Sequence, residues 1–318
     1  MKTVLANDGI SQLGIDTLES AGFEVITQKV AQEQLPNVIN EKQISVLLVR
    51  SATKVRKELI DACPNLQLIG RGGVGMDNID VDYAESKGIG VINTPAASSE
   101  SVAELVFSHL FNLVRFVYDS NRQMPLEGDT KFKDLKKAYA KGQELKGKKL
   151  GIIGFGRIGQ EVAKRAIGLG MEVIVNDKFI KDKEIELTFF DGQKLSFYLK
   201  TSSIETVLQN SDFITLHIPK LSDKAVIGEK EIKMMKDRVG IINAARGGVI
   251  DEEALIKAIE KGKVMAAGLD VFDNEPTPSI KLLMLQNVSL TPHIGAATNE
   301  AQNRIGKELA DKIISHFE

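Results

Sequence analysis

The sequence is poor in the residues that mark several classes of protein. Cys63 is its one cysteine among 318 residues, and it has no tryptophan. A single cysteine excludes an intrachain disulfide and gives no basis for a cysteine-ligated metal, so we predict no metal site. Lysine and arginine (41) nearly balance aspartate and glutamate (43). With a formal net charge of −2, the chain offers no electrostatic attraction for nucleic acid or for a membrane surface.

Long apolar runs are also missing. None approaches the roughly 20 residues that are needed to span a bilayer. The short N-terminal run is interrupted by Asn7 and Asp8, which favours a first strand and turn over a signal peptide. We therefore expect a cytoplasmic protein, whose length suggests about two domains with large cores.

What the sequence does contain is a regular alternation of short apolar runs and amphipathic segments. Residues 44–49 form a continuous apolar run, typical of a parallel strand that is buried on both faces. The alternation up to residue 97 predicts a doubly wound parallel α/β sheet of flavodoxin-like character. Its glycines and cations follow strand ends at 50–54 and 70–78. Ligands of open α/β sheets bind at that edge of the sheet.

A glycine motif opens a second α/β unit at residues 149–177. An apolar strand runs into a Gly-x-Gly-x-x-Gly turn, a helical pattern follows, and the next strand ends in Asp177. Gly154 permits the tight turn, Gly156 lets the backbone approach a pyrophosphate, and Gly159 lets the helix pack on the strand. The Asp177 carboxylate would accept hydrogen bonds from a ribose and repel a 2′-phosphate. The stretch predicts a Rossmann domain that binds NAD; the alternative is a glycine-rich turn in an ordinary βαβ unit.

Two segments interrupt the alternation. Residues 98–119 predict one long helix, and residues 120–148 are polar and rich in lysine. The lysine-rich part suits either a solvated connector or an arm that contacts a second subunit. Residues 185–199 form two alternating runs around an Asp-Gly pair, which is a strong hairpin signal. That hairpin is either a surface decoration or a part of the adenosine edge or of an oligomer contact.

Polar residues at strand ends are the candidates for chemistry. His293 lies after the last strand in a loop of small residues, where a ligand can come close, and histidine exchanges protons near neutral pH. His217 ends a strand and could contact a cofactor or stabilise its own loop. His109 lies inside the predicted long helix, which favours a packing role. Arg246 follows a buried strand, and its guanidinium suits a carboxylate ligand. Glu275, also at a strand end, could be any loop acid.

Several motifs together resemble the D-isomer-specific 2-hydroxyacid dehydrogenase family, over nearly the whole chain. They are the glycine motif with Asp177, Asn-Ala-Ala-Arg-Gly-Gly at 243–248, Asp-Val-Phe-Asp-Asn-Glu-Pro at 270–276 and Thr-Pro-His-Ile-Gly-Ala at 291–296. Within the family the chain is most similar to the D-3-phosphoglycerate dehydrogenases, through residues 50–55, 70–80 and 93–104. It departs from them at Ala97 and Ser98, where a Gly-Asn or Gly-Ser pair is usual, at Val74, where Thr is usual, and in the hairpin. We also expect no C-terminal regulatory domain.

The resemblance implies hydride transfer between NAD and a D-2-hydroxy acid. His293 would take the hydroxyl proton, Glu275 would orient the imidazole and favour its protonated form, and Arg246 would bind the substrate carboxylate. The further implied cofactor contacts are Arg157, Ile158, Val74, His217, Ile218, Ala244, Asp270, Gly295 and Ala296. The implied substrate contacts are the backbone amides of Gly72, Gly73, Val74 and Gly75. Arg50 and Arg71 would bind a phosphate, with Lys54 and Lys137 as weaker candidates, although each of these cations could instead be a solvated surface charge.

The same resemblance implies a division of the chain and a substrate. The substrate-binding domain would be discontinuous, 1–97 plus 293–318, and the NAD-binding Rossmann domain would cover 98–292. The two crossings would be hinges, and a homodimer or tetramer would form through 98–148. The leading interpretation is oxidation of D-3-phosphoglycerate for serine biosynthesis. A glyoxylate or hydroxypyruvate reductase is the nearest alternative and would need neither Arg50 nor Arg71. An NAD-sensing corepressor is the third.

Overall fold

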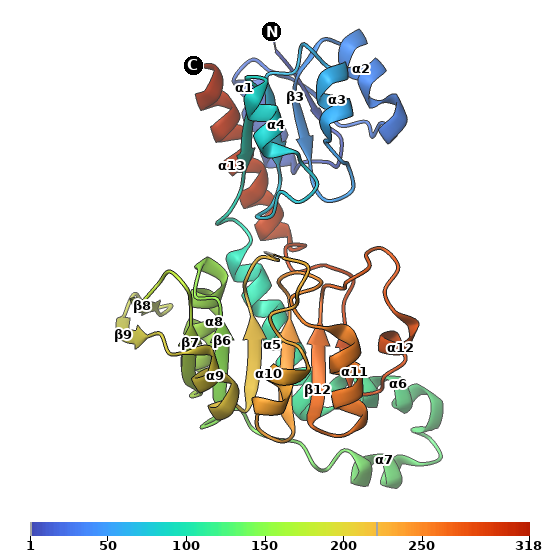
Figure 1. The fold of residues 1–318 in the computed structure, drawn as a ribbon, viewed down its shortest axis with the longest axis vertical. Coiled ribbons are helices and arrows are strands. Elements are labelled where there is room, and N and C mark those ends of the chain that lie inside the picture. Colours follow the sequence, from blue (N-terminus) through green and yellow to red (C-terminus); the bar gives the residue numbers. More distant parts are fainter. Residues whose placement is uncertain (1, 221) are drawn as a thin grey trace. The chain divides into compact units, whose positions relative to one another are not determined.

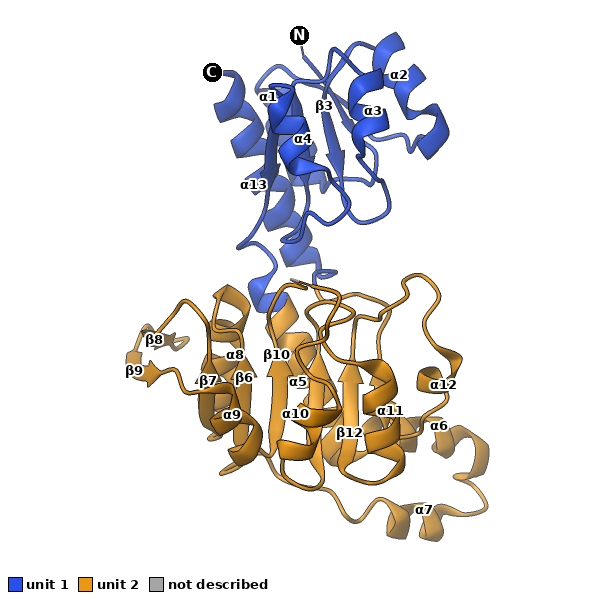
Figure 2. Ribbon diagram, viewed as in Figure 1, with its two compact units in different colours: residues 1–101, 296–318 blue, residues 102–295 orange. Residues whose placement is uncertain are grey.

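The protein divides into two compact units, which Figure 2 colours separately. The computed structural model describes residues 2–220 and 222–318. Unit 1 covers Met1–Ser101 and Ala296–Glu318, and unit 2 covers Val102–Gly295. The sequence predicts these crossings near residues 97 and 293. Each unit contains one open, fully parallel sheet with helices on both faces, which confirms the predicted fold class.

Unit 1, around β3 in Figure 1, is built on five strands in the order β2-β1-β3-β4-β5, the flavodoxin-like order. Alternate strand residues face opposite sides. Val46 and Leu48 therefore pack with one set of helices, while Leu47 and Val49 pack with the other. The elements are β1 (Thr3–Ala6), α1 (Gln12–Ser20), β2 (Glu24–Ile26), α2 (Leu35–Glu41), β3 (Ile44–Val49), α3 (Lys57–Ala62), β4 (Leu68–Arg71), α4 (Val81–Ser86), β5 (Gly90–Asn93) and α13 (Asn299–Phe317).

Asp8 fixes the loop at the point where the strand order of unit 1 reverses, between β1 and β3. Its carboxylate accepts hydrogen bonds from the backbone amides of Arg50 at 2.7 Å and Thr53 at 3.0 Å, and from the Thr53 hydroxyl at 2.8 Å. The side-chain amide of Asn78 donates to the Arg50 carbonyl at 2.8 Å. Side chains from two other loops thus hold the loop after β3 and place Arg50 at the carboxyl edge of the sheet.

Unit 2 is built on six strands in the order β13-β12-β11-β10-β6-β7. Its two faces bury separate apolar clusters, one against α5 and α8 and the other against α9, α10 and α11 (Figure 1). The strands are β6 (Lys149–Ile153), β7 (Glu172–Asn176), β10 (Phe213–Leu216), β11 (Val239–Asn243), β12 (Val264–Leu269) and β13 (Val288–Leu290). The helices are α5 (Ser99–Arg115), α8 (Arg157–Gly168), α9 (Ile204–Asn210), α10 (Glu229–Met234), α11 (Glu252–Glu260) and α12 (Ile280–Leu283).

The prediction of one long helix over 98–119 is wrong. Helix α5 ends at Arg115, Phe116 takes a left-handed backbone conformation (φ 55°), and α6 (Val117–Glu127) starts in a new direction. The Tyr139 hydroxyl donates to Asp119 at 2.7 Å, which ties α6 to the end of α7 (Phe132–Ala138). The apolar stripe of the sequence continues past the break, so its periodicity gave no sign of it. The segment 120–148, which reads as polar and irregular, carries most of these two helices.

The hairpin is confirmed and is longer than predicted. Strands β8 (Asp182–Thr188) and β9 (Lys194–Lys200) pair antiparallel, and residues 189–193 close the loop. Ile185 is buried and packs with the α8 face of unit 2. By contrast, Phe190 at the loop and Tyr198 on β9 are exposed. The hairpin is therefore attached to the unit through buried Ile185 and through Leu187 and Leu199, which are partly buried against the same cluster.

Smaller differences follow from local chemistry. Strand β4 is displaced two residues from the predicted 66–69, because Leu66 is drawn into the turn after α3 by a backbone hydrogen bond to Cys63 at 3.1 Å. Helix α2, of 7 residues, and α12, of 4 residues, are too short to be recognised from periodicity. Within the described ranges, no helix is long and apolar enough to cross a membrane.

Candidate active site

The candidate residues of unit 2 follow the carboxyl ends of its parallel strands. The strand order reverses between β6 and β10, and the loops after these two strands touch. Gly154 follows β6 with a φ of 96°, and a Cβ added there would collide with the carbonyl of His217, which follows β10. Ligands of open α/β sheets bind at such a reversal. Glycine is thus needed at position 154 for two reasons: the positive φ angle and the close contact with the His217 carbonyl.

The glycine loop fits a dinucleotide phosphate. A Cβ at Gly159 would collide with the Gly154 carbonyl, so the missing side chain lets α8 pack on the turn. Gly156 is the N-cap of α8, no side chain caps the helix, and a Cβ built on Gly156 would meet no atom within 4 Å. The amides of the first turn, at Arg157, Ile158 and Gly159, are the donors that a pyrophosphate needs, and the positive end of the helix dipole favours its charge.

Asp177 organises the same loop. One carboxylate oxygen accepts from the Phe155 amide at 2.7 Å, and the other accepts from the amides of Phe179 at 2.8 Å and Ile180 at 2.9 Å. Burial by itself raises the pKa of Asp177, but these three backbone hydrogen bonds outweigh it and lower the pKa below its ordinary value of 3.8. Asp177 is therefore an anion with about one lone pair left for a ribose hydroxyl, and it also links the glycine loop to the end of β7.

His217 is held neutral. Its Nε2 is 3.0 Å from the Thr215 hydroxyl, and its Nδ1 is buried and makes no hydrogen bond within the described part of the chain. Burial lowers the pKa of His217 to about 3. Its backbone nitrogen donates to the Ile153 carbonyl at 2.8 Å. These contacts make His217 a support of the loop beside the glycine motif; the expected cofactor contacts of His217 and Ile218 stay predictions.

Arg246 lies in a loop that Asn243 shapes. The Asn243 side chain donates to the Arg246 carbonyl at 2.9 Å and accepts from the Ala245 amide at 3.1 Å. The sequence contains this asparagine in a motif, but its role was not predicted. The Arg246 guanidinium donates to the Ala245 carbonyl at 2.7 Å. At Gly247 a Cβ would collide with the Phe272 carbonyl, so this loop lies in backbone contact with the one that carries Glu275.

His293 and Glu275 form a hydrogen-bonded pair. Nδ1 of His293 lies 2.8 Å from Oε2 of Glu275, and Oε1 of Glu275 accepts from the Phe272 amide at 3.0 Å. The side chains are 40% and 36% exposed, so the pair is open to solvent on one side. A carboxylate accepts and does not donate, so Nδ1 carries the proton and Nε2 is the nitrogen free for a ligand. This is the arrangement of a general base held by a second group.

Asp270 supports the loop of His293. It is 1% exposed and accepts from the amides of Ile294 at 2.7 Å and Gly295 at 2.8 Å and from the Thr291 hydroxyl at 2.6 Å. His293 itself has a φ of 56°, an uncommon conformation for a residue with a side chain. The predicted cofactor contacts of Asp270, Ala244 and Gly295 stay predictions, but the support that Asp270 gives to the loop was not predicted from the sequence.

The substrate candidates lie in unit 1, at the ends of β3 and β4. Gly73 has a φ of 149°, and a Cβ there would collide with the Arg71 guanidinium. A Cβ at Gly72 would lie 3.6 Å from the side chain of Arg50. Two arginines thus flank the Gly72–Gly73 turn, while Val74 is exposed. Lys54 and, in unit 2, Lys137 have exposed side chains, and Ala296 accepts a hydrogen bond from Gln302 at 2.7 Å. The predicted roles of all these residues stay predictions.

Comparison with known proteins identifies the family. The model for the NAD-binding domain of D-isomer-specific 2-hydroxyacid dehydrogenases matches residues 107–295. The chain is also 46% identical to the hydroxypyruvate reductase of Thermotoga maritima over 299 residues, which are 93% of this chain and 91% of the relative. The chain belongs to the D-isomer-specific 2-hydroxyacid dehydrogenase family. Unit 2 is accordingly its NAD-binding domain, and NAD is the cofactor. Among the described residues, no cluster of three His, Cys, Asp or Glu side chains could hold a metal ion.

Other relatives differ in the reaction that their names state. The D-3-phosphoglycerate dehydrogenase of Methanocaldococcus jannaschii is 42% identical over 316 residues, 98% of this chain and 57% of the relative, so the chain spans little more than half the length of that enzyme. The structure of a glyoxylate reductase from Paecilomyes thermophila is similar with a TM-score of 0.81 and 30% identity, over 100% of this chain and 95% of the other. These dehydrogenases share a fold across several 2-hydroxy acids.

Proposed function

We propose that this dehydrogenase oxidises D-3-phosphoglycerate to 3-phosphohydroxypyruvate with NAD, as a step of cytoplasmic serine biosynthesis. The observation that carries the choice of a phosphorylated substrate is the pair of arginines, Arg50 and Arg71, beside the Gly72–Gly73 turn. A substrate with both a carboxylate and a phosphate needs more than one cation. Arg246 of unit 2 would serve the carboxylate, which leaves the unit 1 arginines for the phosphate.

Bound NAD supplies the acceptor for the hydride that leaves C2. The protein supplies proton transfer and binding. Because Nδ1 of His293 faces Glu275 at 2.8 Å, Nε2 takes the proton of the C2 hydroxyl as C2 becomes a ketone. The Glu275 carboxylate then stabilises the imidazolium with a charge-assisted hydrogen bond. In the reverse direction Nε2 returns that proton to the ketone oxygen. Arg246 binds the carboxylate next to C2 and polarises the oxygen that gains or loses the proton.

The test compares two substrates that differ in one group. Reduction of 3-phosphohydroxypyruvate and of hydroxypyruvate, each with NADH, isolates recognition of the phosphoryl group. We expect Arg50→Ala and Arg71→Ala each to lower kcat/KM for the phosphorylated substrate about 10-fold to 100-fold, since a hydrogen bond to a charged group contributes about 1.5–3 kcal/mol. The value for hydroxypyruvate should stay within about twofold.

The control is Lys29→Ala, which removes an exposed cation of unit 1 outside the turn. It should leave both substrates unaffected. Equal losses on the two substrates in the arginine variants, with melting temperatures unchanged, would contradict the phosphate assignment.

A hydroxypyruvate or glyoxylate reductase is the second candidate. The observation in its favour is the 46% identity with a hydroxypyruvate reductase of matching length. The same assay separates the two, because a reductase of this kind would turn over hydroxypyruvate at least as efficiently as its phosphorylated form. If NADH bound and no 2-oxo acid were reduced, an NAD-sensing binding protein would be favoured instead.

We further propose that the enzyme is a homodimer joined through α5, α6 and α7. These helices expose large apolar side chains, among them Leu126 at 73% and Phe132 at 57%. Large apolar side chains that are exposed together mark a protein contact. Leu126→Asp with Phe132→Asp should convert a dimer to a monomer in sedimentation velocity, whereas Phe190→Asp on the hairpin should not. A wild-type protein that sediments as a monomer would refute the proposal.

A further inference from the structure

His109 of α5 lies in a polar cluster under the apolar face of the helix. Its side chain is 1% exposed, yet both ring nitrogens have partners. Nδ1 is 2.9 Å from the Ser289 hydroxyl, and Nε2 is 3.0 Å from the Thr291 hydroxyl. Gly268 of β12 makes room for the ring, because a Cβ there would lie 2.6 Å from the Cβ of His109. A histidine that served only as packing would not need two hydroxyl partners and a glycine opposite.

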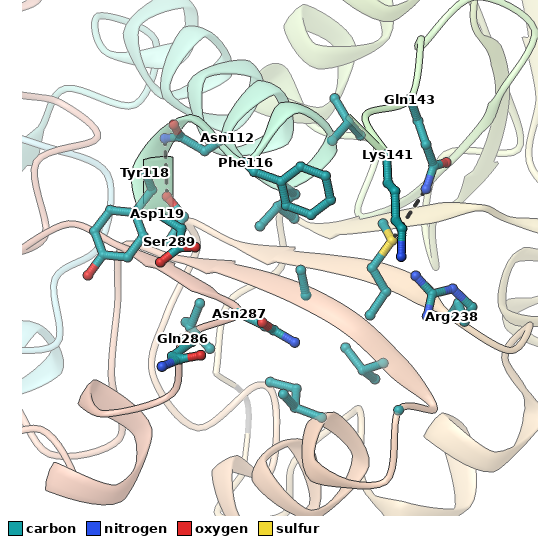
Figure 3. Close-up of a pocket in the computed structure, with 18 residues that line it drawn as sticks. Asn112, Phe116, Tyr118, Asp119, Lys141, Gln143, Arg238, Gln286, Asn287 and Ser289 are labelled. Carbon is teal, nitrogen blue, oxygen red and sulfur yellow. Dashed lines mark hydrogen bonds between the residues drawn. The ribbon is translucent and has the colours of Figure 1, made fainter. Parts of the chain in front are cut away.

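The hydrogen bonds of this cluster run in one direction. Asp270 is an acceptor, so the Thr291 hydroxyl must donate its single proton to Asp270 at 2.6 Å. Thr291 therefore accepts from Nε2 of His109, and Nδ1 in turn accepts from Ser289. The Ser289 oxygen accepts from the side-chain amide of Asn112 at 3.2 Å. Figure 3 shows that last bond at the wall of a cavity of about 260 Å³.

Only a neutral His109 ring gives every donor and acceptor of this hydrogen-bond chain a partner. Burial lowers the pKa of His109, and the nearby Asp270 carboxylate opposes this only in part. A proton on Nδ1 would face a Ser289 oxygen that already accepts from Asn112, and it would leave the serine proton without its acceptor. The imidazole is thus a fixed donor toward Thr291.

The hydrogen-bond chain that starts at Asn112 ends at the backbone around His293. The Asp270 oxygen that accepts from Thr291 also accepts from the Ile294 amide at 2.7 Å, and its second oxygen accepts from the Gly295 amide at 2.8 Å. On the other side, the His293 amide donates to the Thr291 carbonyl at 3.1 Å. Residues held by this hydrogen-bond chain therefore lie two positions before His293, at Thr291, and one position after it, at Ile294.

We propose that His109 is a positioning residue, which acts through Thr291 and Asp270 to keep His293 in the backbone conformation that points its imidazole at Glu275. The proposal rests on the proposed role of His293 in proton transfer. The hydrogen bonds of the His109 ring go to Ser289 and Thr291, and its effect on His293 is the orientation of a ring. A displacement of about 1 Å at a reacting group costs about 100-fold in rate.

The test replaces the ring and keeps its volume. His109→Phe removes both hydrogen bonds, and we expect kcat for the best substrate to fall about 10-fold to 100-fold while KM for NADH changes less than about threefold. His109→Gln keeps one donor and one acceptor and should recover part of the rate. Thr291→Val cuts the same chain one step later, so adding it to His109→Phe should lower kcat little further.

Leu110→Ala is the matched control, because Leu110 is the neighbouring buried residue of α5 and has no polar partner. It should lower the melting temperature at least as much as His109→Phe and leave kcat unchanged. Equal losses of kcat in these two variants would overturn the proposal, as would a folded His109→Phe with wild-type kcat.

A second readout does not depend on turnover. The ¹⁵N shifts of the His293 ring report which nitrogen carries the proton, and the wild type should hold the Nδ1–H tautomer that faces Glu275. His109→Phe should reduce the population of that tautomer, and Leu110→Ala should not. An unchanged tautomer in His109→Phe would also overturn the proposal. His293→Gln tests the proposed role of His293 separately from that of His109. Retained activity in His293→Gln would refute proton transfer by His293, whatever the result for His109→Phe.

Discussion

Glu275→Gln is the most informative single change in this enzyme, because it alters one atom of the His293 pair. In the wild type, Oε1 accepts from the Phe272 amide at 3.0 Å and Oε2 faces Nδ1 of His293 at 2.8 Å. The glutamine oxygen will take the Phe272 amide, since that partner can only donate. The new NH₂ group then faces Nδ1 and makes it an acceptor. The proton moves to Nε2, the nitrogen that we propose accepts the substrate proton.

The size of the effect follows from the bond that is lost. A hydrogen bond between charged partners contributes about 1.5–3 kcal/mol, and solvent screens this pair because its side chains are 36% and 40% exposed. The lower half of that range corresponds to about a 10-fold to 50-fold loss of kcat. Steady-state NAD reduction with saturating D-3-phosphoglycerate measures it, because Nε2 accepts the proton in this direction. KM for NAD should not change, since Glu275 does not belong to the glycine loop.

Glu253→Gln is the matched control, a helix α11 carboxylate that is 61% exposed and 3.9 Å from Lys281. It changes the net charge equally and should leave kcat unchanged. Wild-type kcat in Glu275→Gln would refute the reasoning, because the pair would then have no part in setting the tautomer of His293.

Two further predictions concern the cofactor loop. Gly154→Ala should weaken NADH binding more than 10-fold in a fluorescence titration. The added methyl group meets the His217 carbonyl, and the positive-φ backbone conformation costs about 1–3 kcal/mol for a residue with a side chain. The control is Gly192→Ala in the hairpin, with a φ of 83° and open space, which should leave the affinity for NADH intact. Because burial lowers the pKa of His217 to about 3, the folded protein stays neutral at this ring while the unfolded chain gains a proton below about pH 6.5. The stabilisation is complete above that value and is lost as the pH falls toward 3, so urea unfolding should show about 2 kcal/mol less stability at pH 5 than at pH 7 from this group. A His217→Gln protein with the same pH dependence as the wild type would contradict that assignment.

Much of the fold could be predicted because its signals are local. Parallel strands such as β3 and β11 are continuous apolar runs, and α11 and α13 begin at side-chain caps, Asp251 and Thr298, that the structure uses. The break at Phe116 could not be predicted, because the apolar stripe of α5 runs on to Val117 and the change of direction lies in a single φ angle. Helix propensity does not encode such a turn.

The candidate site also contains residues that could be predicted from the sequence and residues that could not. The glycine motif, Arg246 and His293 are visible because each follows a strand end, and the carboxyl ends of parallel strands share one edge. Glu275 has the same position but gained its predicted role only from the family resemblance. The support beneath them is not visible. His109 is distant in sequence from Ser289 and Thr291 and lies in the middle of an apolar stripe, so it reads as packing. Its hydroxyl partners become apparent only when α5 is laid across β12 and β13.

The absence of a side chain at Gly247 has a consequence for redesign of this enzyme. Because its backbone packs directly against Phe272, the segments that carry Arg246 and Glu275 can change position only together. Mutant libraries that vary either segment alone would mostly yield enzymes that have lost both functions at once. Variation at residues 50–54 and 71–75 does not touch this contact. A search for activity on new 2-hydroxy acids should therefore draw its diversity from the N-terminal unit and leave the paired segments as they are.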